Sequence, residues 1–479
     1  MSAQPKSSPQ PSGNEGELKR SLSLTMCVTL VMGAMIGSGI FTMTGTAIGM
    51  VGTKVPFAFL MASLFVLVTN IPAIFQSGAL PATGGSYMYV SRFVHPTFGY
   101  IHILNSLMGT FNIALMATTA SMYMQPLLPS VPTHITAAIL IVVLAIAGNY
   151  GAKVSGMLQN IIIIIMGVAL LTFIVPGFGK IEAEFVTIGE ALFPGTLEFA
   201  SLWSAIAILR YSLSGGGVVF TLGDEVKNPG FTIPAAFFIG TIIVTVFYCL
   251  IGYVTVGVLP LDQVANQPLS VAAAAILGEN SGAFKFFIVG GALLATITTL
   301  NGSFMIYSRT MFAAARDGVL PKVLSKTNKH GVPHVAIGVC TLIGLTVVLL
   351  KLTVNELLNF IAIPGLVLGF IYYLPPIMIM KKLPNCAKNA WFKIPNFILA
   401  PLSIGSAVLL FSLGTTLFAR MQPSHYIGMV VFYSLGFVYW FFRVRHLRKE
   451  GIDLIANMKG LHPYWIELEE KYARENAQK

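Results

Sequence analysis

The sequence predicts an all-α polytopic membrane protein with twelve transmembrane helices. Of its 479 residues, 55% are hydrophobic and 10% are charged, and the mean hydropathy is +0.78. Soluble domains carry about 25% charged residues, so this composition excludes an ordinary soluble protein. Apolar runs of about 20 residues, long enough to cross a bilayer as helices, recur along the chain. They lie near residues 24–49, 56–80, 98–125, 134–150, 154–176, 199–222, 232–259, 284–314, 334–352, 355–380, 395–419 and 426–442.

The distribution of positive charge predicts the orientation of these spans. An even number of spans places both termini on one side of the membrane. If that side is the cytoplasm, the inner loops hold Arg92, Lys153, Lys227, Arg316, Lys322, Lys326, Lys329, Lys381, Lys382, Lys388 and Lys393, and the outer loops hold Lys54, Lys180, Lys285, Lys351 and Arg420. Cationic loops stay inside, so we expect a multi-pass cell-membrane protein with both termini in the cytoplasm. This bias accounts for the net charge of +11 without a nucleic-acid partner.

The first span contains an unusual cluster of small residues from Gly33 to Phe41, with glycine at 33, 37 and 39 and serine at 38. Each glycine inside a helix costs about 1 kcal/mol relative to alanine, so the cluster favours an interruption. Unwound backbone survives at membrane depth only where protein or a cavity satisfies its polar groups, which makes an interruption a candidate binding site. The alternative is close helix packing through Gly33 and Gly37.

The sixth span contains a second cluster, from Arg210 to Gly217, with three consecutive glycines at its end. It falls on the first helix of a second set of five, as the cluster from Gly33 to Phe41 falls on the first helix of the first set. Interrupted helices at corresponding positions of two halves are typical of transporters built from inverted repeats, with the substrate site at the repeat interface. The pairing of the two clusters therefore favours transport.

Opposed helix ends suit a zwitterionic substrate. Free backbone N–H groups at a helix start, here around Ser38 to Phe41, can hold a carboxylate. Orphan carbonyls at a helix end, here around Tyr211 to Ser214, can hold an ammonium group. The two interruptions could thus bind both charges of an amino acid without an ionised side chain.

Several polar residues of the spans have two interpretations each. Arg210 could neutralise a second acidic group of a substrate or replace a coupling cation, or it could be a structural strut. Thr298 and Thr299 could line the site or ligate a sodium ion, but hydroxyls also bond back to their own helix. Asn112 in the third span could face a cavity or form an interhelical hydrogen bond.

Other features have simpler explanations. The connection that begins with Pro81 to Tyr89 is too polar to span, and we interpret it as a short re-entrant or interfacial helix on the inner face, or as a cytoplasmic turn. Cys27, Cys249, Cys340 and Cys386 lack ligand spacing, so we expect no disulfide framework, no metal site and no cofactor.

Taken together, four stretches resemble the amino acid/polyamine/organocation superfamily of secondary transporters. They are Gly33 to Phe41, Pro81 to Tyr89, Asp224 to Pro229 with Ile233-Pro234 after it, and Arg309 to Pro321. The resemblance covers residues 20 to 445. It implies alternating access and a five-plus-five inverted repeat, with helices 1 and 6 broken and two extra C-terminal helices.

The resemblance also implies a substrate site between helices 1, 3, 6, 8 and 10. The residues that we expect to bind substrate are Met35, Ile36, Gly37, Ser38, Gly39, Ile40, Asn112, Tyr211, Ser212, Ser214, Gly215 and Gly216. Candidates for coupling or charge compensation are Arg210, Thr298 and Thr299. Met166 stands where many sodium-independent members have a lysine, Gln76 where a glutamate is common, and Gly216 and Gly217 where a bulky aromatic is common.

The predicted organisation is a disordered tail (1–23), a transport core (24–380, with repeats 24–178 and 199–380), two further helices (395–442) and a cytoplasmic tail (443–479). The expected function is a permease or exchanger for amino acids, with an amine or polyamine exchanger as the alternative. Proton or sodium coupling is open. A membrane enzyme is disfavoured because HExxH, GxSxG and P-loop motifs do not occur.

Overall fold

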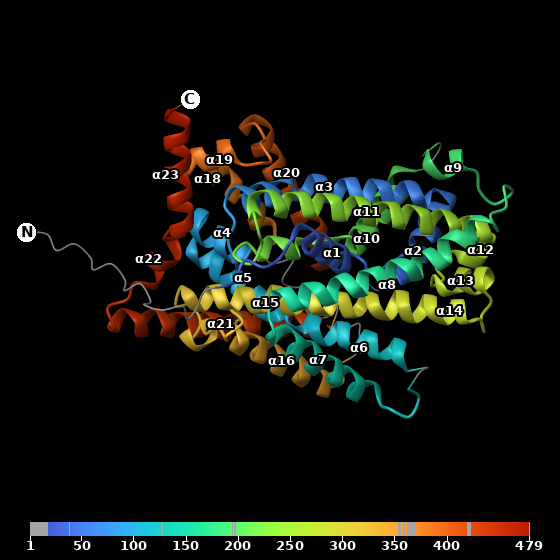
Figure 1. The fold of residues 1–479 in the computed structure, drawn as a ribbon, viewed down its shortest axis with the longest axis horizontal. Helices are drawn as coiled ribbons and strands as arrows, with labels where there is room; N and C mark the ends of the chain where they lie inside the picture. Colours follow the sequence, from blue (N-terminus) through green and yellow to red (C-terminus); the bar gives the residue numbers. More distant parts are fainter. Residues whose placement is uncertain are drawn as a thin grey trace, which may run out of the picture.

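The structure is a computed structural model that describes residues 18–37, 39–125, 128–193, 195, 198–352, 356–357, 360–361, 369–418 and 423–478. The described chain is helical, with two isolated β-bridges that pair Leu22 with Val226 and Thr83 with Leu222. The long helices run side by side along the longest axis of the molecule (Figure 1). This arrangement confirms the predicted all-α class.

The first part of the chain forms nine elements. They are α1 (Leu24–Met35), α2 (Gly39–Val51), η1 (Gly52–Lys54), α3 (Val55–Ala79), α4 (Ser86–Phe93), α5 (Pro96–Gly109), α6 (Phe111–Met124), α7 (Thr133–Asn149) and α8 (Ala152–Phe178). Their boundaries follow local chemistry. The Ser23 hydroxyl accepts a hydrogen bond from the Met26 N–H at the start of α1, and Pro96 occupies the first turn of α5. The short helix α4 confirms that the connection after Pro81 contains a helix.

The second part begins with a connecting segment and one interrupted span, which is formed by α10 and η2. Its elements are α9 (Ile188–Leu192), α10 (Phe199–Ser212), η2 (Ser214–Thr221), α11 (Pro229–Val258), α12 (Leu261–Val264), α13 (Ser270–Leu277), α14 (Gly282–Phe286), η3 (Phe287–Leu293), α15 (Leu294–Arg316), η4 (Lys322–Ser325) and α16 (His334–Leu349). The segment η3 is a π-helix inside a continuous span from Gly282 to Arg316. A π-helical turn often marks a functional position in a helix.

The last part contains η5 (Gly369–Tyr373), α18 (Pro375–Lys382), α19 (Pro384–Asn389), α20 (Asn396–Phe418), α21 (Pro423–Lys449), α22 (Leu454–Lys459) and α23 (Pro463–Ala477). The tenth predicted span, 355–380, lies partly outside the described residues. We call the end of the bundle at which α4, α19, α22 and α23 gather the α4 end (Figure 1).

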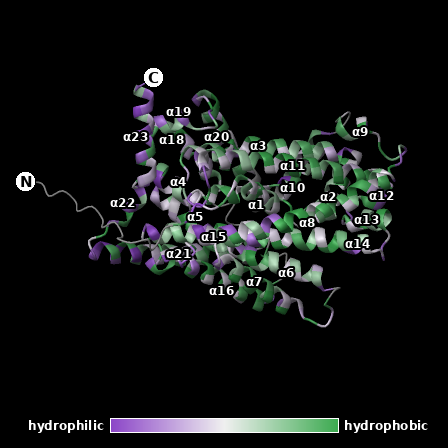
Figure 2. Cartoon of the chain, viewed as in Figure 1, coloured by the Kyte–Doolittle hydropathy of each residue, from purple (hydrophilic) through white to green (hydrophobic). Residues whose placement is uncertain are grey.

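Six helical stretches of the described chain are long and apolar enough to cross a membrane, or seven if α10 and η2 form one bent span. Hydrophobic residues follow these helices, whereas hydrophilic residues gather on α22, α23 and the end of α21 (Figure 2). Large apolar side chains also face outward along α8, where Ile161 is 56% and Ile164 is 66% exposed. An exposed apolar surface of this kind suits lipid, so the chain is a multi-pass membrane protein.

Candidate functional site

The first predicted interruption is confirmed. Helix α1 ends at Met35 and α2 begins at Gly39. The Ile36 N–H still donates to the Met32 carbonyl at 2.7 Å, but the Gly37 N–H turns back to the Met35 carbonyl at 2.9 Å. Ser38, which we expected to contribute to substrate binding, lies outside the described residues. The start of α2 therefore presents backbone N–H groups with no preceding turn of the same helix.

The second interruption is a bend followed by a change of helix type. Helix α10 ends at Ser212, and η2 continues at an angle of 40°. The three glycines do not lie in unwound chain, because they form part of the 3₁₀-helix η2. Hydrogen bonds from i to i+3 satisfy their backbone while the axis turns. The side chain of Tyr211 lies outside what the structure describes.

The two interruptions are packed directly against each other. A Cβ atom on Gly215 would lie 1.8 Å from the carbonyl oxygen of Ala34, and one on Gly39 would lie 2.6 Å from the Ser212 Oγ. A Cβ on Gly216 would lie 2.3 Å from the terminal methyl carbon of Met35. Only glycine permits such close approach of two backbones. The structure thus brings together residues that are nearly 180 positions apart in the sequence.

The hydroxyl of Tyr248 on α11 joins the two interruptions. It lies 3.0 Å from the Met35 carbonyl oxygen and 3.4 Å from that of Ser212, the last residues of α1 and α10. Tyr248 is fully buried, and each carbonyl has a second lone pair. The sequence analysis missed this residue because a single tyrosine in an apolar span gives no pattern.

Two hydroxyls from α15 meet the end of α1. Thr298 and Thr299 donate to the Gly33 carbonyl at 2.9 Å and 3.1 Å. Each also bonds to the Ala295 carbonyl of its own helix, at 2.8 Å and 3.0 Å. The expected bond of each hydroxyl to its own helix is therefore present, and both hydroxyls also contact the end of α1.

Gln159 of α8 meets α1 at the level of Gly33, whereas Met166, the position compared above with a lysine of related transporters, is buried further along the same helix. A Cβ on Gly33 would lie 2.0 Å from the Gln159 Nε2, and the Gln159 Oε1 accepts from Asn301 Nδ2 at 2.9 Å. Gln159 is fully buried and uncharged, so it supplies hydrogen bonds but no fixed cation here. The polar residues of α8 are few, and the sequence did not show which of them faces α1.

Two other predicted residues have contrasting environments. Asn112 donates from Nδ2 to Ser303 Oγ at 2.8 Å, so it makes the interhelical hydrogen bond between α6 and α15. Arg210 lies half-buried in the last turn of α10, within electrostatic range of Tyr373 on η5. The part of the chain that the structure describes gives the Arg210 side chain no hydrogen bond or ion pair.

Three of the four stretches that carry the family resemblance, all except Gly33 to Phe41, meet at the α4 end. Arg309 forms a buried bidentate ion pair with Glu225, both contacts at 2.8 Å, and Arg92 on α4 pairs with Asp317 at 2.9 Å. The Asp224 N–H donates to the Thr83 hydroxyl at 3.2 Å. The bidentate Arg309–Glu225 pair fixes orientation as well as charge, whereas in the second pair both Asp317 oxygens accept from the one nitrogen Nη2 of Arg92. At the α4 end, the two pairs join α15 to the segment between η2 and α11, and the residue after α15 to α4.

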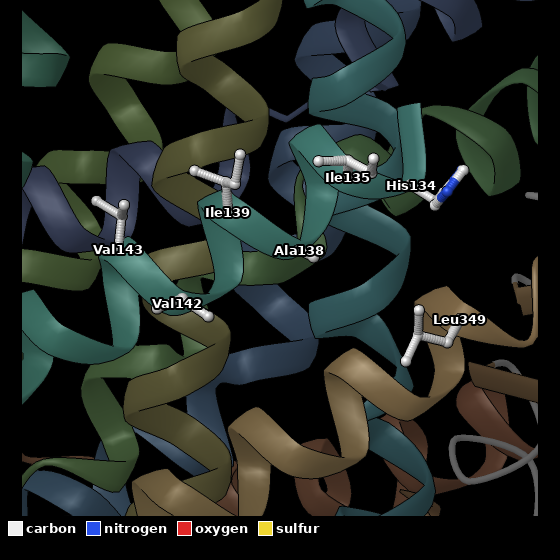
Figure 3. Close-up of a pocket in the computed structure, with 7 residues that line it drawn as sticks. All are labelled: His134, Ile135, Ala138, Ile139, Val142, Val143 and Leu349. Atoms are coloured by element: carbon white, nitrogen blue, oxygen red, sulfur yellow. The ribbon is translucent and has the colours of Figure 1, made fainter. Parts of the chain in front are cut away.

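An apolar groove of about 330 Å³ lies between α7 and α16 (Figure 3). Its lining residues are His134, Ile135, Ala138, Ile139, Val142, Val143 and Leu349. Ile139 and Val143 are more than half exposed, as expected for a lipid-facing surface. None of the predicted substrate residues lines this groove. Within the described residues, no group of three His, Cys, Asp or Glu side chains could hold a metal ion.

These features define a helical multi-pass membrane protein with two interrupted helices in contact at its core. A family model described as "Amino acid permease" matches residues 27–451. The chain belongs to this amino acid permease family, which is a family of transporters.

Individual relatives agree with this assignment. The branched-chain amino acid permease BcaP of Bacillus subtilis is 26% identical over 88% of this chain and 93% of its own length. The serine/threonine exchanger SteT of the same organism is 24% identical over 84% of this chain and 92% of its own. The lysine-specific permease LysP of Lactococcus lactis is 24% identical over 70% of each chain.

Proposed function

We propose that this permease moves amino acids across the cell membrane by alternating access, with the substrate held where its two interrupted helices meet. The observation that carries the proposal is the contact between the ends of α1 and α10, joined by Tyr248. Interrupted helices in two corresponding positions are the feature expected of such a site. The names of the relatives, which include permeases and an exchanger for amino acids, support the same substrate class.

Twelve spans in a five-plus-five inverted repeat are the arrangement that we propose for the chain. The long described helices and the four shorter apolar helices fit the predicted spans other than the tenth, which lies partly outside the described residues. The excess of Lys and Arg in alternate loops supports cytoplasmic termini, which makes the α4 end the cytoplasmic end. This orientation is used below.

The substrate carboxylate would bind the free N–H groups at the start of α2, around Gly39 and Ile40. A helix start carries positive dipole charge and suits an anion. The ammonium group would bind carbonyl oxygens at the end of α10, where the Ser212 oxygen keeps a lone pair beyond its 3.4 Å contact with Tyr248. Backbone groups, more than side chains, would therefore recognise the part that all amino acids share.

Arg210 would select among side chains. A fixed guanidinium charge in the last turn of α10 repels a second ammonium group but attracts a second carboxylate. Arg210 is half-buried in the last turn of α10, two residues before Ser212, so its charge would lie close to the proposed ammonium site. This disfavours the alternative of an amine or polyamine exchanger.

Two coupling schemes follow from the same residues. In the first, a sodium ion binds oxygen atoms near the Gly33 carbonyl, Thr298 and Thr299, since hard cations take oxygen ligands. In the second, the charge of Arg210 replaces that of a coupling cation and transport follows exchange or a proton gradient. The schemes differ in whether sodium changes the rate.

The test is uptake of labelled amino acids into proteoliposomes that contain the purified protein. A broad panel of amino acids and amines is offered while sodium and pH gradients are varied separately. We expect saturable uptake of at least one amino acid. If neither amino acids nor amines are accumulated or exchanged by a correctly folded preparation, the proposal fails.

A further inference from the structure

The C-terminal segment after the last long helix is folded back onto the protein. Helices α22 and α23 lie at the α4 end, and α23 runs across the direction of the long helices (Figure 1). Within this segment Met458 and Trp465 are fully buried and Leu454 is 1% exposed. A charged tail that only extended into solvent would not bury three large apolar side chains.

Trp465 is the central contact of this segment with α4. Its ring stacks on the rings of Tyr89 and Phe93, each with centroids 5.8 Å apart. Its indole N–H donates to the Pro81 carbonyl at 3.0 Å. Burial of a tryptophan with a satisfied N–H is a strong and specific packing contact.

A second set of contacts joins α23 to α19. The carboxylate of Glu469 accepts hydrogen bonds from the backbone N–H groups of Asn385 and Cys386, at 2.9 Å and 2.7 Å, and from the Asn385 side chain at 2.8 Å. The Asn476 side-chain amide adds a bond to Asn385 at 3.1 Å. Helix α23 thereby bridges α4, from the first half of the chain, and α19, which follows the second half.

Hydrogen bonds also hold the end of α21, the helix that leads into this segment. The Arg443 Nε donates to the Gly318 carbonyl at 2.9 Å, and the Tyr439 hydroxyl donates to the Val319 carbonyl at 2.9 Å. Both carbonyls lie directly after Asp317, the ion-pair partner of Arg92 on α4. The end of α21 thus contacts the chain directly after Asp317, while Trp465 in α23 contacts α4, the helix that forms an ion pair with Asp317.

We propose that residues 454–477 are an intramolecular clamp on the cytoplasmic gate, which holds α4 against α18 and α19 and must loosen before this gate opens. The inference rests on the proposed transport function for its consequence. The gate itself is the set of contacts between the loop before α4 and η2, such as the hydrogen bond from Gly84 N–H to the Thr221 carbonyl at 3.2 Å. Trp465 acts as a positioning residue, because it touches α4 and not the substrate.

A native thiol reports whether the clamp is closed. Cys386 is fully buried, and its backbone N–H is bonded to Glu469. We expect Trp465→Ala in the full chain, reconstituted in nanodiscs, to raise maleimide labelling of Cys386 by about tenfold, read by peptide mass spectrometry. The matched control is Ile466→Ala, because Ile466 is 44% exposed on the same helix and should leave labelling unchanged. Glu469→Gln is a milder second variant that removes charge from the α19 contact if the tryptophan variant does not fold.

Opening of the gate is read separately, by amide hydrogen exchange. The clamp predicts about tenfold faster exchange at Gly84 and along α4 in both variants, and faster exchange of labelled amino acid across proteoliposomes. If Cys386 becomes accessible while exchange at Gly84 and α4 stays at the wild-type rate, the clamp is overturned and the proposed transport function is untouched. If the wild-type protein transports no amino acid but Gly84 still responds, the transport proposal fails and the clamp stands.

Discussion

Gly215 gives the sharpest test of the contact between the two interruptions. A Cβ at this position would lie 1.8 Å from the Ala34 carbonyl oxygen and 2.4 Å from its carbon, both of which are backbone atoms. Ordinary contact needs 3.5 Å or a little less, so Gly215→Ala must force the two helices apart by about 1.5 Å. Overpacking of this kind costs about 1–3 kcal/mol. A displacement of 1 Å within a site costs on the order of 100-fold in rate, so we expect at least this loss of transport.

The matched control is Gly217→Ala, two residues further along the same 3₁₀-helix. A Cβ on Gly217 would meet only Phe220 of its own segment, at an ordinary 3.5 Å. We expect this variant to keep transport within a factor of about three, because alanine is as good a helix residue as glycine or better. The assay is initial uptake in proteoliposomes at equal amounts of monodisperse protein. Equal activity of the two alanine variants would refute the argument that the helix ends must touch.

Four further outcomes follow from single side chains. Tyr248→Phe should lower thermal stability and uptake, because unpaired buried carbonyls cost about 1–3 kcal/mol; unchanged melting and uptake would count against its bridging role. Arg210→Ala should shift substrate preference away from acidic and toward cationic amino acids in competition assays, whereas unaltered kinetics would support the strut. Arg309→Met should lower stability by about 3–5 kcal/mol in denaturation, since it leaves Glu225 buried and unpaired, and the Arg309→Met/Glu225→Gln double variant should recover part of the loss. Clamp closure should weaken as pH falls below about 6.5, and His462→Gln should remove this dependence of Cys386 labelling.

The sign of the pH effect comes from the surroundings of His462, which precedes α23 and contacts Trp465. Burial lowers the pKa of His462, and the charged groups that face it partly cancel. Asp224 and Asp317 raise the pKa, whereas Arg316 and Arg92 lower it. A histidine whose pKa is lower in the closed clamp binds a proton more readily in the open one. The contribution of His462 to closure is therefore fully present above its ordinary pKa and is lost as the pH falls from there through the lower pKa of the closed clamp.

Hydropathy was enough to predict the fold class and the position of most spans. The clusters of glycine located both interruptions, because glycine is costly inside a membrane helix. The type of interruption between α10 and η2 was predicted less accurately, since the three glycines form part of a 3₁₀-helix that follows a bend. A glycine run shows that a regular α-helix is disfavoured there, but it does not show which other hydrogen-bond pattern replaces it.

The partners of the interruptions could not be predicted, since each depends on tertiary packing. Tyr248 is 213 residues from Met35, and Gln159 is one polar residue in a long apolar helix. The sequence shows that such a residue is polar but not which neighbour it faces. Trp465 is an aromatic residue in an otherwise charged segment, which indicates contact with the protein or the membrane surface but not that the residue packs on α4. Burial of one aromatic residue leaves no periodic signal.

The stretches that carry the family resemblance at the α4 end and the proposed substrate site have different physical roles in this chain. Two of the stretches that carry the family resemblance, Asp224 to Pro229 and Arg309 to Pro321, meet at the α4 end, where ion pairs join Glu225 to Arg309 and Asp317 to Arg92 of α4. The proposed substrate site uses backbone groups at Gly39 and Ser212, which any amino acid can share. Changes in the ion pairs should therefore alter the rate of conformational change for all substrates alike. In the proposed site, discrimination between substrates would come from the charge of Arg210 beside the second interruption.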